Sequence, residues 1–220
     1  MRLPDLLKLV YPAKCVLCTA LLPADQTGLC HDCRTSIKEY PDPRIRLPHL
    51  ESWAALWYYE DSVRESILRF KFGHRPAYAK TYGQLLAMKV IQRQTKYDLL
   101  TWVPTARLRQ RKRGYDQVAL LARATAKQLG TKAIPVLKKI RNNPPQSGLG
   151  NAAQRRANVL GAYRLIPSVQ VAGKRILLID DVITTGATAG ECARMLRLAG
   201  AKSVTCAAVA RRHENKKASR

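Results

Sequence analysis

Two adjacent aspartates, Asp180 and Asp181, follow a run of four apolar residues in the segment ILLIDDVITTGAT, residues 176–188. The apolar run predicts a buried strand of a parallel sheet, and ligands bind outside the carboxyl ends of such strands. We therefore expect both carboxylates to project from the rim of the sheet. In that position they can accept hydrogen bonds from vicinal hydroxyl groups and hold the outer shell of a Mg²⁺ ion.

The stretch TTGAT that ends this segment is typical of a phosphate-binding loop. A helix is predicted to begin within it, and backbone N–H groups at a helix start bind anions. Its glycine permits close approach of the backbone to a ligand, and its threonine hydroxyls add donors. The residues expected around the phosphate are Thr184, Thr185, Gly186, Ala187 and Thr188.

The aspartates and the loop together predict a site for a 5-phosphorylated ribose. A carboxylate pair this close to a phosphate would repel it, so the pair is expected to face the sugar hydroxyls instead. The alternative is that the aspartates only cap the helix and that the threonines favour a turn.

Four cysteines near the N-terminus form two CxxC pairs that are eleven residues apart. In each pair a tight turn brings two thiolates to one side, and two such knuckles supply the ligands of a tetrahedral zinc site. His31 lies inside the second pair and is an alternative ligand, and an iron–sulfur cluster is the alternative to zinc. A segment this small buries little apolar area, so the metal is expected to be structural and to supply much of the folding energy. The predicted ligands are Cys15, Cys18, Cys30 and Cys33.

The 220-residue chain is strongly basic, with 39 Lys and Arg residues against 15 Asp and Glu residues and a net charge of +24. The basic residues are spread along the chain, which favours nucleic acid or another polyphosphate as a partner. A ribosome-associated or merely high-pI protein is the alternative.

The N-terminal segment carries Asp5 and Lys8 within its apolar run, which is not typical of a signal peptide. No apolar run approaches the ~18 residues that span a bilayer. These features predict a cytoplasmic protein without a membrane span. In that reducing compartment cysteines serve as metal ligands or core thiols rather than disulfides, and Cys192 and Cys206 are interpreted as core thiols.

The segment RLRQRKRGY, residues 107–115, carries five basic residues before its tyrosine. At a helix entrance these charges are expected to draw phosphates toward the rim of the sheet, and a solvated run of charges is the alternative. The residues predicted to contact nucleic acid are Arg109, Arg111, Lys112 and Arg113.

Apolar periodicity predicts strands that alternate with helices, as in an α/β protein whose parallel sheet is covered on both faces. The predicted strands span residues 52–60, 97–104, 133–140, 174–181 and 201–210. The predicted helices span residues 61–73, 77–94, 114–130, 151–160 and 187–200, with a loop at 142–150. Asp61 is the expected N-cap of the first helix. Trp53, Trp57 and Tyr59 alternate along the first strand, so they form either a core face or a platform on which bases stack.

Residues 176–188 resemble the phosphoribosyl pyrophosphate (PRPP) signature of type I phosphoribosyltransferases. Over residues 15–211 the chain is similar to the ComF/GntX family, whose members join an N-terminal four-cysteine zinc finger to such a domain and serve DNA uptake in natural competence. Three further segments carry this resemblance: VPTARLRQRKRGYDQ (103–117), QSGLGNAAQRRANVLGAY (146–163) and, more weakly, RFKFG (69–73).

The resemblance implies a fold and a division of the chain. Residues 1–39 would form the zinc-finger module, a small zinc ribbon, and residues 40–52 a proline-rich linker. Residues 53–211 would adopt the type I phosphoribosyltransferase fold, a mostly parallel sheet flanked by helices, and residues 212–220 a basic tail. The zinc module would stand where enzymes of this fold carry the hood that recognises a base.

The resemblance also implies roles for individual residues. Asp180 and Asp181 would bind the ribose hydroxyls, the loop at 184–188 would bind the 5-phosphate, and a loop at 141–155 would close over the site. Asp116 stands where the family usually has asparagine, and this extra carboxylate opposes polyanion contact there. The turn expected to face pyrophosphate comprises Thr105, Ala106 and Arg107.

The function that the resemblance implies is binding of single-stranded DNA and of PRPP or a related nucleotide. Mg²⁺ would accompany PRPP, and other competence proteins, such as a helicase or a DNA-processing protein, would be partners. One alternative is an active phosphoribosyltransferase, in which an unidentified acceptor displaces pyrophosphate at C1 of PRPP. Another is a regulator that senses PRPP. Neither a catalytic residue nor an acceptor pocket follows from the sequence.

Overall fold

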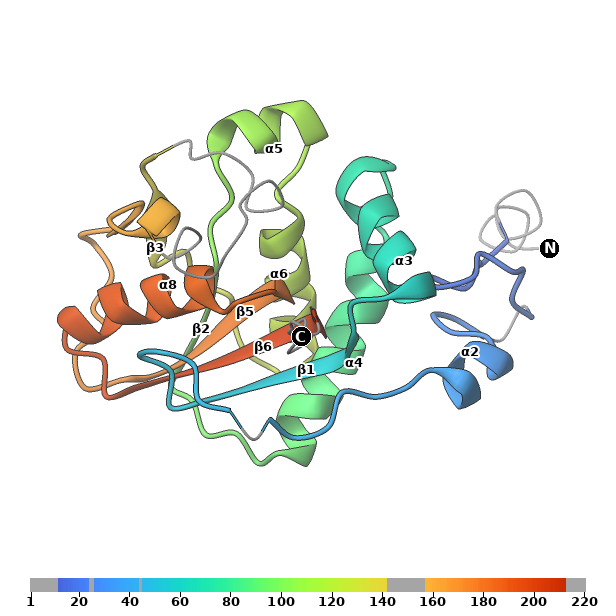
Figure 1. Cartoon of the computed structure of the whole chain (residues 1–220), viewed down its shortest axis with the longest axis horizontal. Helices are drawn as coiled ribbons and strands as arrows, with labels where there is room; N and C mark the ends of the chain where they lie inside the picture. Colours follow the sequence, from blue (N-terminus) through green and yellow to red (C-terminus); the bar gives the residue numbers. More distant parts are fainter. Residues whose placement is uncertain (1–11, 24–25, 44, 142–156, 213–220) are drawn as a thin grey trace, which may run out of the picture.

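A four-stranded parallel sheet forms the centre of the molecule, in the order β1-β6-β5-β2 (Figure 1). The computed structural model describes residues 12–23, 26–43, 45–141 and 157–212. The strands are β1 (Ser52–Tyr58), β2 (Leu99–Trp102), β5 (Arg175–Ile183) and β6 (Ser203–Arg211). All neighbours in this sheet run parallel, as the predicted alternation of strands and helices indicates.

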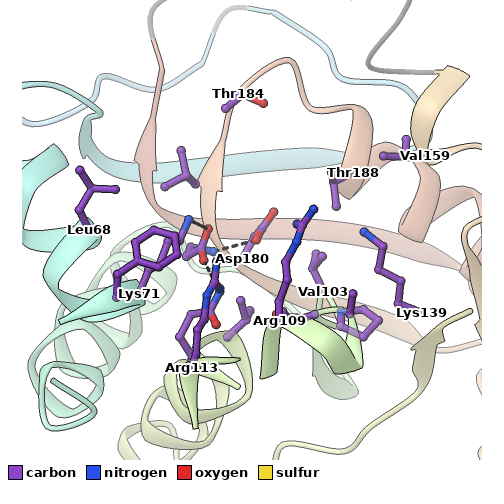
Figure 2. A pocket seen from close by; sticks show the side chains of 18 of the residues that line it. Leu68, Lys71, Val103, Arg109, Arg113, Lys139, Val159, Asp180, Thr184 and Thr188 are labelled. Atoms are coloured by element: carbon purple, nitrogen blue, oxygen red, sulfur yellow. Dashed lines mark hydrogen bonds and ion pairs between the residues drawn. The ribbon is translucent and has the colours of Figure 1, made fainter. Parts of the chain in front are cut away.

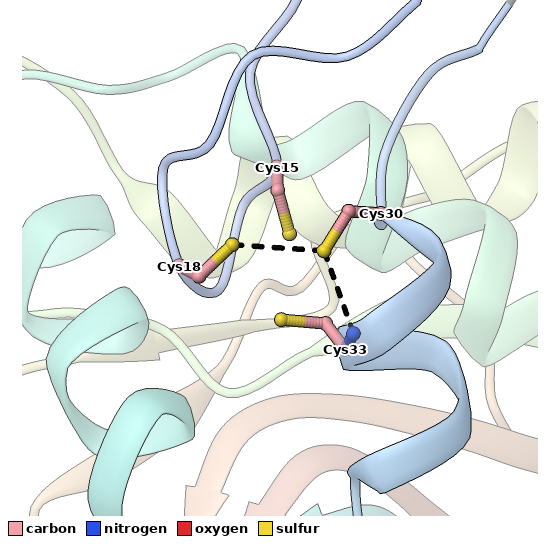
Figure 3. Close-up of side chains that lie close together, drawn as sticks. All are labelled: Cys15, Cys18, Cys30 and Cys33. Atoms are coloured by element: carbon pink, nitrogen blue, oxygen red, sulfur yellow. Dashed lines mark hydrogen bonds between the residues drawn. The ribbon is translucent and has the colours of Figure 1, made fainter.

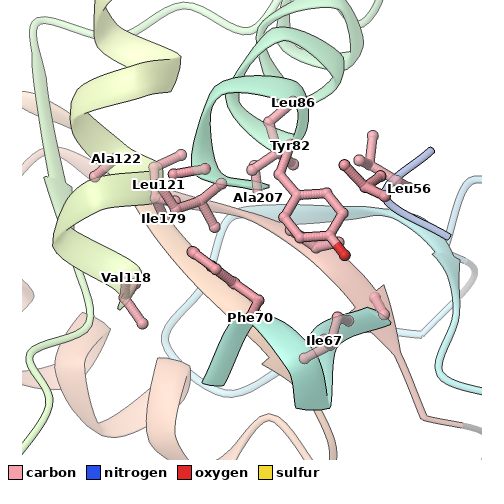
Figure 4. Close-up of a cluster of buried hydrophobic side chains, with 14 of the residues drawn as sticks. Leu56, Ile67, Phe70, Tyr82, Leu86, Val118, Leu121, Ala122, Ile179 and Ala207 are labelled. Carbon is pink, nitrogen blue, oxygen red and sulfur yellow. The ribbon is translucent and has the colours of Figure 1, made fainter. Parts of the chain in front are cut away.

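Helices cover both faces of the sheet. Successive residues of the central strand β5 point to opposite faces, and the apolar residues on each face are buried. Leu177 and Ile179 belong to one buried cluster, which Figure 4 shows, and Ile176 and Leu178 belong to the other. This arrangement confirms the prediction of a parallel sheet buried on both faces. The helices of the first cluster are α3 (Asp61–Phe72), α4 (Tyr78–Gln92) and α6 (Gln117–Gln128), and that of the second is α8 (Ala187–Leu198).

The aromatic residues of β1 are part of the core. Trp53 and Trp57 are only 2 % and 4 % exposed, and both faces of the strand are buried instead of one. Tyr59 follows the end of the strand and is partly buried. The two tryptophans therefore do not form a stacking platform for bases, and the core interpretation of this pattern is confirmed.

A second, small sheet departs from the prediction. The strand expected at 133–140 pairs with the edge of β2 over a short distance. Leu100 and Ala133 form a bridge, and the Ile134 N–H donates to the Leu100 carbonyl at 2.9 Å. Pro135 follows and has no N–H to continue the ladder. The chain then forms an antiparallel pair that the sequence did not predict. Its strands are β3 (Leu137–Lys139) and β4 (Tyr163–Leu165).

Two helices also differ from their predicted form. The N-cap of α3 is Glu60 rather than Asp61, which is the first helical residue and has a φ of 42°. The basic segment forms a helix of its own, α5 (Arg107–Arg113), which ends at Gly114 in the left-handed conformation. The sequence of α5, RLRQRKR, has no apolar periodicity from which a helix could be predicted, and none of its residues is buried.

Several predicted segments lie outside the described residues. These are the loop at 142–150, most of the loop at 141–155, the first part of the helix expected at 151–160, and residues 213–220 of the tail. Residues 157–159 are helical, as predicted. Within the described parts of the chain, no helix combines the length and apolarity needed to cross a membrane.

Candidate functional site

Strand β5 carries the acidic pair on the sheet itself, which corrects the prediction that the aspartates project from its rim. The strand continues through both aspartates to Ile183, because β6 pairs with it that far. Strand β2 stops opposite Ile179, whose carbonyl accepts the Val103 N–H at 3.0 Å. From Asp180 onward one edge of β5 therefore has no strand neighbour in the described sheet, and each aspartate is 7 % exposed there.

A cleft of about 540 Å³ opens beside this edge of β5 (Figure 2). Its lining comes from α3, the turn after β2, α5, the start of α6, the β3–β4 sheet and the start of α8. The carboxylates of Asp180 and Asp181 line it together with cationic side chains. The cleft therefore attracts an anion and also offers hydrogen-bond acceptors. Its cations are Lys71, Arg109, Lys112, Arg113, Lys139 and Arg212.

The two carboxyl groups of the pair are held in different ways. Asp181 accepts from Lys71 Nζ at 2.8 Å on Oδ1 and from Gln117 Nε2 at 3.1 Å on Oδ2. Asp180 Oδ1 accepts the backbone N–H of Asp181 at 2.8 Å. Burial raises the pKa of Asp180 to about 8, and the neighbouring charge of Asp181 acts in the same direction. The surroundings of Asp180 therefore favour its protonated form over its carboxylate.

The loop between β5 and α8 lies at one side of the cleft, where Thr184 and Thr188 line it. Gly186 has a φ of 76°, which other residues rarely adopt, and a Cβ at this position would also force Leu47 to shift, because it would lie 2.6 Å from Leu47 Cδ2. The buried guanidinium of Arg211 donates to the Thr184 carbonyl and fixes the loop from β6. Thr185, Gly186 and Ala187 complete the loop but are not among the residues that line the cleft.

The turn after β2 places Thr105 and Ala106 in the lining of the cleft, whereas Arg107 is exposed and outside it. Asp116 caps the start of α6 and accepts the N–H groups of Val118 and Ala119, both at 3.1 Å. The Thr105 hydroxyl also donates to it at 3.2 Å. The Asp116 carboxylate, which departs from the family pattern, therefore accepts hydrogen bonds from the protein itself.

The basic helix α5 turns only part of its charge toward the cleft. Arg109, Lys112 and Arg113 line the cleft, whereas Arg111 does not. Arg113 stacks on the ring of Phe72 at 4.7 Å from its centre, and burial lowers the pKa of this guanidinium. Because Arg107 and Arg111 are exposed, the helix presents cations both to the cleft and to solvent.

Sequence reasoning missed several residues of the cleft. Lys71 belongs to the RFKFG segment and Gln117 ends the segment at 103–117, so both lie in recognised motifs, but no role was predicted for either residue. Lys139 and Tyr163 come from β3 and β4, where Lys139 Nζ lies 5.2 Å from the ring centre of Tyr163. Tyr163 ends the recognised segment at 146–163, whereas Lys139 lies in no recognised motif and is brought to the cleft by this sheet.

The four predicted cysteine ligands converge at the other site of the molecule (Figure 3). Their sulfur atoms all lie within 4.8 Å of one another, and Cys18 Sγ is 3.6 Å from Cys30 Sγ. A tetrahedral zinc ion with Zn–S bonds of ~2.3 Å needs sulfur separations of ~3.8 Å, so the cluster fits such a metal. Burial of Cys15 acts to raise its pKa, but hydrogen bonds from the backbone at Cys18 and Cys30 outweigh it and lower the pKa to about 7. The pKa of Cys33 is raised instead, mainly by burial, and that of Cys18 is also raised. The convergence of the four sulfur atoms, and not the acidity of the thiols, therefore supports a metal site. His31 is exposed and is not part of the cluster.

The first cysteine knuckle packs directly on α3. Val16 and Leu17 are 3 % and 1 % exposed and share a cluster with buried residues of that helix. Arg69 Nη2 donates to the carbonyls of both residues, and the Ser66 hydroxyl donates to that of Val16. The knuckle therefore holds the helix that carries Lys71. A domain boundary at residue 39 stays a prediction.

Comparison with known proteins finds a domain match and several similar chains. Residues 119–220 match the model of the phosphoribosyl transferase domain. The chain is 27 % identical over 222 residues to Competence protein F of Haemophilus influenzae, and this match covers 90 % of this chain and 96 % of that protein. It is 29 % identical over 220 residues to DNA utilization protein YhgH of Escherichia coli O157:H7, covering 89 % and 96 %. It is also 27 % identical over 187 residues to Competence protein ComFC of Streptococcus pneumoniae, covering 85 % and 77 %.

Over most of its length the chain is thus similar to proteins named Competence protein F and ComFC, in agreement with its resemblance to the ComF/GntX family. The domain match and the parallel sheet with helices on both faces confirm the predicted type I phosphoribosyltransferase fold, preceded by a four-cysteine cluster that can hold a metal. A solved structure similar in fold is the allosteric regulatory enzyme of purine biosynthesis, which is 23 % identical with a TM-score of 0.44. The match covers 64 % of this chain and 29 % of that enzyme, so the chain spans less than a third of the enzyme's length.

One equivalent of zinc is expected in protein purified without added metal, because four thiols converge at tetrahedral distances. The double variant Cys15→Ser/Cys30→Ser should lose that metal, as measured by elemental analysis. Cys192→Ala alters a buried thiol outside the cluster and should keep it. An unchanged zinc content in the double variant would show that the assignment is wrong.

The free energy of unfolding is expected to depend on pH through Asp180. The unfolded chain releases this proton near pH 3.8, whereas the folded chain keeps it to about pH 8. Between these values the unfolded state binds fewer protons, so the contribution is complete below pH 3.8 and is lost as the pH rises to about 8. In urea unfolding, Asp180→Asn should therefore gain stability relative to the unaltered chain as the pH rises. A stability difference that stays constant over this pH range contradicts the assignment.

Proposed function

We propose that the cleft binds PRPP or a related 5-phosphorylated ribose. The observation that carries this proposal is a buried acidic pair on β5 beside a hydroxyl-bearing loop, within a cleft that is otherwise cationic. A phosphate alone would be repelled by the pair, and a neutral sugar would not need the cations. A sugar that carries phosphate satisfies both parts of the cleft.

Each part of the cleft has a proposed role toward this ligand. Asp180 and Asp181 accept the ribose hydroxyls, and the loop at 184–188 holds the 5-phosphate, with Thr184 and Thr188 nearest to the cleft. The turn at 105–107 receives the pyrophosphate of PRPP, whose charge is shared with Mg²⁺ and with the cations of α5. Together these residues would fix the orientation of the sugar.

Transfer of the phosphoribosyl group to an acceptor, or sensing of PRPP, would use the same cleft. Binding is the function proposed, because transfer needs a second subsite for the acceptor and no residue of the described lining is assigned to one. A pyrophosphate-release assay across bases and oligonucleotides separates transfer from binding alone.

A second candidate function is handling of single-stranded DNA during natural competence. It is favoured by the net charge of +24 and by α5, a helix without buried residues that carries cations on several sides. Similar proteins are named Competence protein F and DNA utilization protein YhgH. We propose that a strand follows Arg109, Arg111, Lys112 and Arg113, and that other competence proteins deliver or receive it.

Asp181→Asn should weaken binding of ribose 5-phosphate and PRPP by about tenfold, because it removes a charge-assisted hydrogen bond to a hydroxyl. Its effect on inorganic phosphate, measured by the same calorimetric titration, should be under about threefold. Asp98→Asn removes a carboxylate that pairs with Arg175 at the opposite end of β5, and it should leave both affinities unchanged. Equal losses for sugar phosphate and phosphate in Asp181→Asn would indicate a general structural role for this residue.

The triple variant Arg109→Ala/Arg111→Ala/Arg113→Ala should lower the slope of log K against log salt for single-stranded DNA by about 2. Each phosphate contact releases a counterion and contributes ~0.7 to that slope. A matched triple change to alanine at Arg123, Lys127 and Lys132, which are exposed toward the end of α6 and beyond it, should alter the slope less. An unchanged slope in the first variant would remove α5 from the DNA path, and absence of binding at low salt would rule out the DNA proposal.

A further inference from the structure

Lys71, in the last turn of α3, forms an ion pair with Asp181 of the acidic pair. Its ammonium lies 2.8 Å from Asp181 Oδ1, and the two side chains are 17 % and 9 % exposed. Figure 2 shows the lysine reaching from its helix toward the pair on β5. The ion pair joins residues that are 110 positions apart in the sequence. It is a partly buried contact at the centre of the proposed sugar site rather than a surface salt bridge.

Lys71 already places a positive charge where a metal ion would bind the pair. Its ammonium lies 2.8 Å from Asp181 Oδ1. A divalent cation at this carboxylate would either displace the lysine or bind beside its charge. Arg113 and Lys139 also act electrostatically on the two aspartates, so the added charge would be repelled from two further directions.

Gln117 adds an unused acceptor to the same cluster. Its Nε2 donates to Asp181 Oδ2, while its Oε1 is buried without a hydrogen-bond partner within the described structure. The residue is 3 % exposed and lines the cleft. A buried acceptor without a partner is destabilising, and a ligand that brings a hydroxyl donor removes this cost. The vicinal hydroxyls of a ribose supply such donors.

The position of Lys71 is fixed by its neighbours on α3. Two residues before it, Arg69 donates to the carbonyls of the first cysteine knuckle. Phe70 is fully buried, and its carbonyl accepts the hydroxyl of Tyr115. The ammonium is therefore preorganised at the carboxylate before any ligand arrives, as a bound cofactor ion would be.

We propose that Lys71 is a resident cation that takes the place of a divalent metal ion at the acidic pair. The ribose hydroxyls of a 5-phosphorylated ribose then bind Asp180, Asp181 and Gln117 without Mg²⁺. This inference rests on the proposed function and specifies it: Mg²⁺ enters the cleft with the pyrophosphate of PRPP and not through the carboxylates. Ribose 5-phosphate lacks the pyrophosphate and therefore probes the pair alone.

The test is calorimetric titration of the full chain with ribose 5-phosphate at pH 7, in EDTA and in excess MgCl₂. The unaltered protein should bind with the same Kd in both buffers to within about twofold, because the pair needs no metal. Lys71→Met should bind at least about tenfold more weakly in EDTA and recover most of this loss in MgCl₂. Lys71→Arg keeps the charge and should bind in both buffers. Titration with MgCl₂ alone should show binding to Lys71→Met but not to the unaltered protein.

Lys112→Met is the matched control, since Lys112 lines the cleft but no contact with either aspartate is described for it. Any change that it causes in the affinity for ribose 5-phosphate should be equal in EDTA and in MgCl₂. The proposal is overturned if the unaltered protein binds ribose 5-phosphate only with Mg²⁺, or if Lys71→Met loses affinity equally in both buffers. The first of these results needs no variant to fold, and it leaves the proposed function standing. Absence of ribose 5-phosphate binding under every condition overturns the proposed function itself.

Discussion

Two adjacent carboxyl groups on one buried strand impose the constraint on which the cleft depends. Two buried carboxyl groups that repel each other electrostatically are costly to ionise together. Burial raises the pKa of Asp180, and Asp181 is paired with Lys71 and Gln117, which come from α3 and α6. The acidic pair therefore requires two helices from separate parts of the chain to be in place. The part of β5 that the sequence predicts as a ligand site is therefore also where β5 contacts α3 and α6 through side-chain hydrogen bonds.

The two sites of the molecule are linked through one helix. The knuckle between Cys15 and Cys18 receives hydrogen bonds from Arg69 and Ser66, and the same helix ends beside Asp181 with Lys71. A metal that stabilises the knuckle therefore also stabilises the position of a cation in the cleft. This contact gives the cysteine module a role in shaping the cleft without requiring any ligand contact of its own.

Local patterns in the sequence predicted what depends on local chemistry. The apolar run before Asp180, the loop around Gly186 and the paired cysteines each correspond to a feature of the structure, because strand periodicity, positive φ and ligand spacing are properties of short segments. Helix α5 has no buried face, and β3 and β4 have three residues each, so neither leaves a periodic signal. The pairing of Lys71 with Asp181 arises only from tertiary packing. For the same reason the sequence did not predict that β5 extends past its aspartates, since the length of the strand is set by its partner β6.

The central claim is that the acidic pair recognises the sugar and the loop after β5 recognises its phosphate. The most direct measurement is a crystal structure of the full chain with ribose 5-phosphate. The ribose hydroxyls should lie within hydrogen-bond distance of Asp180 and Asp181, with the phosphate at the loop formed by residues 184–188. A ligand whose phosphate lies against the cations of α5, with its hydroxyls away from both aspartates, would contradict it.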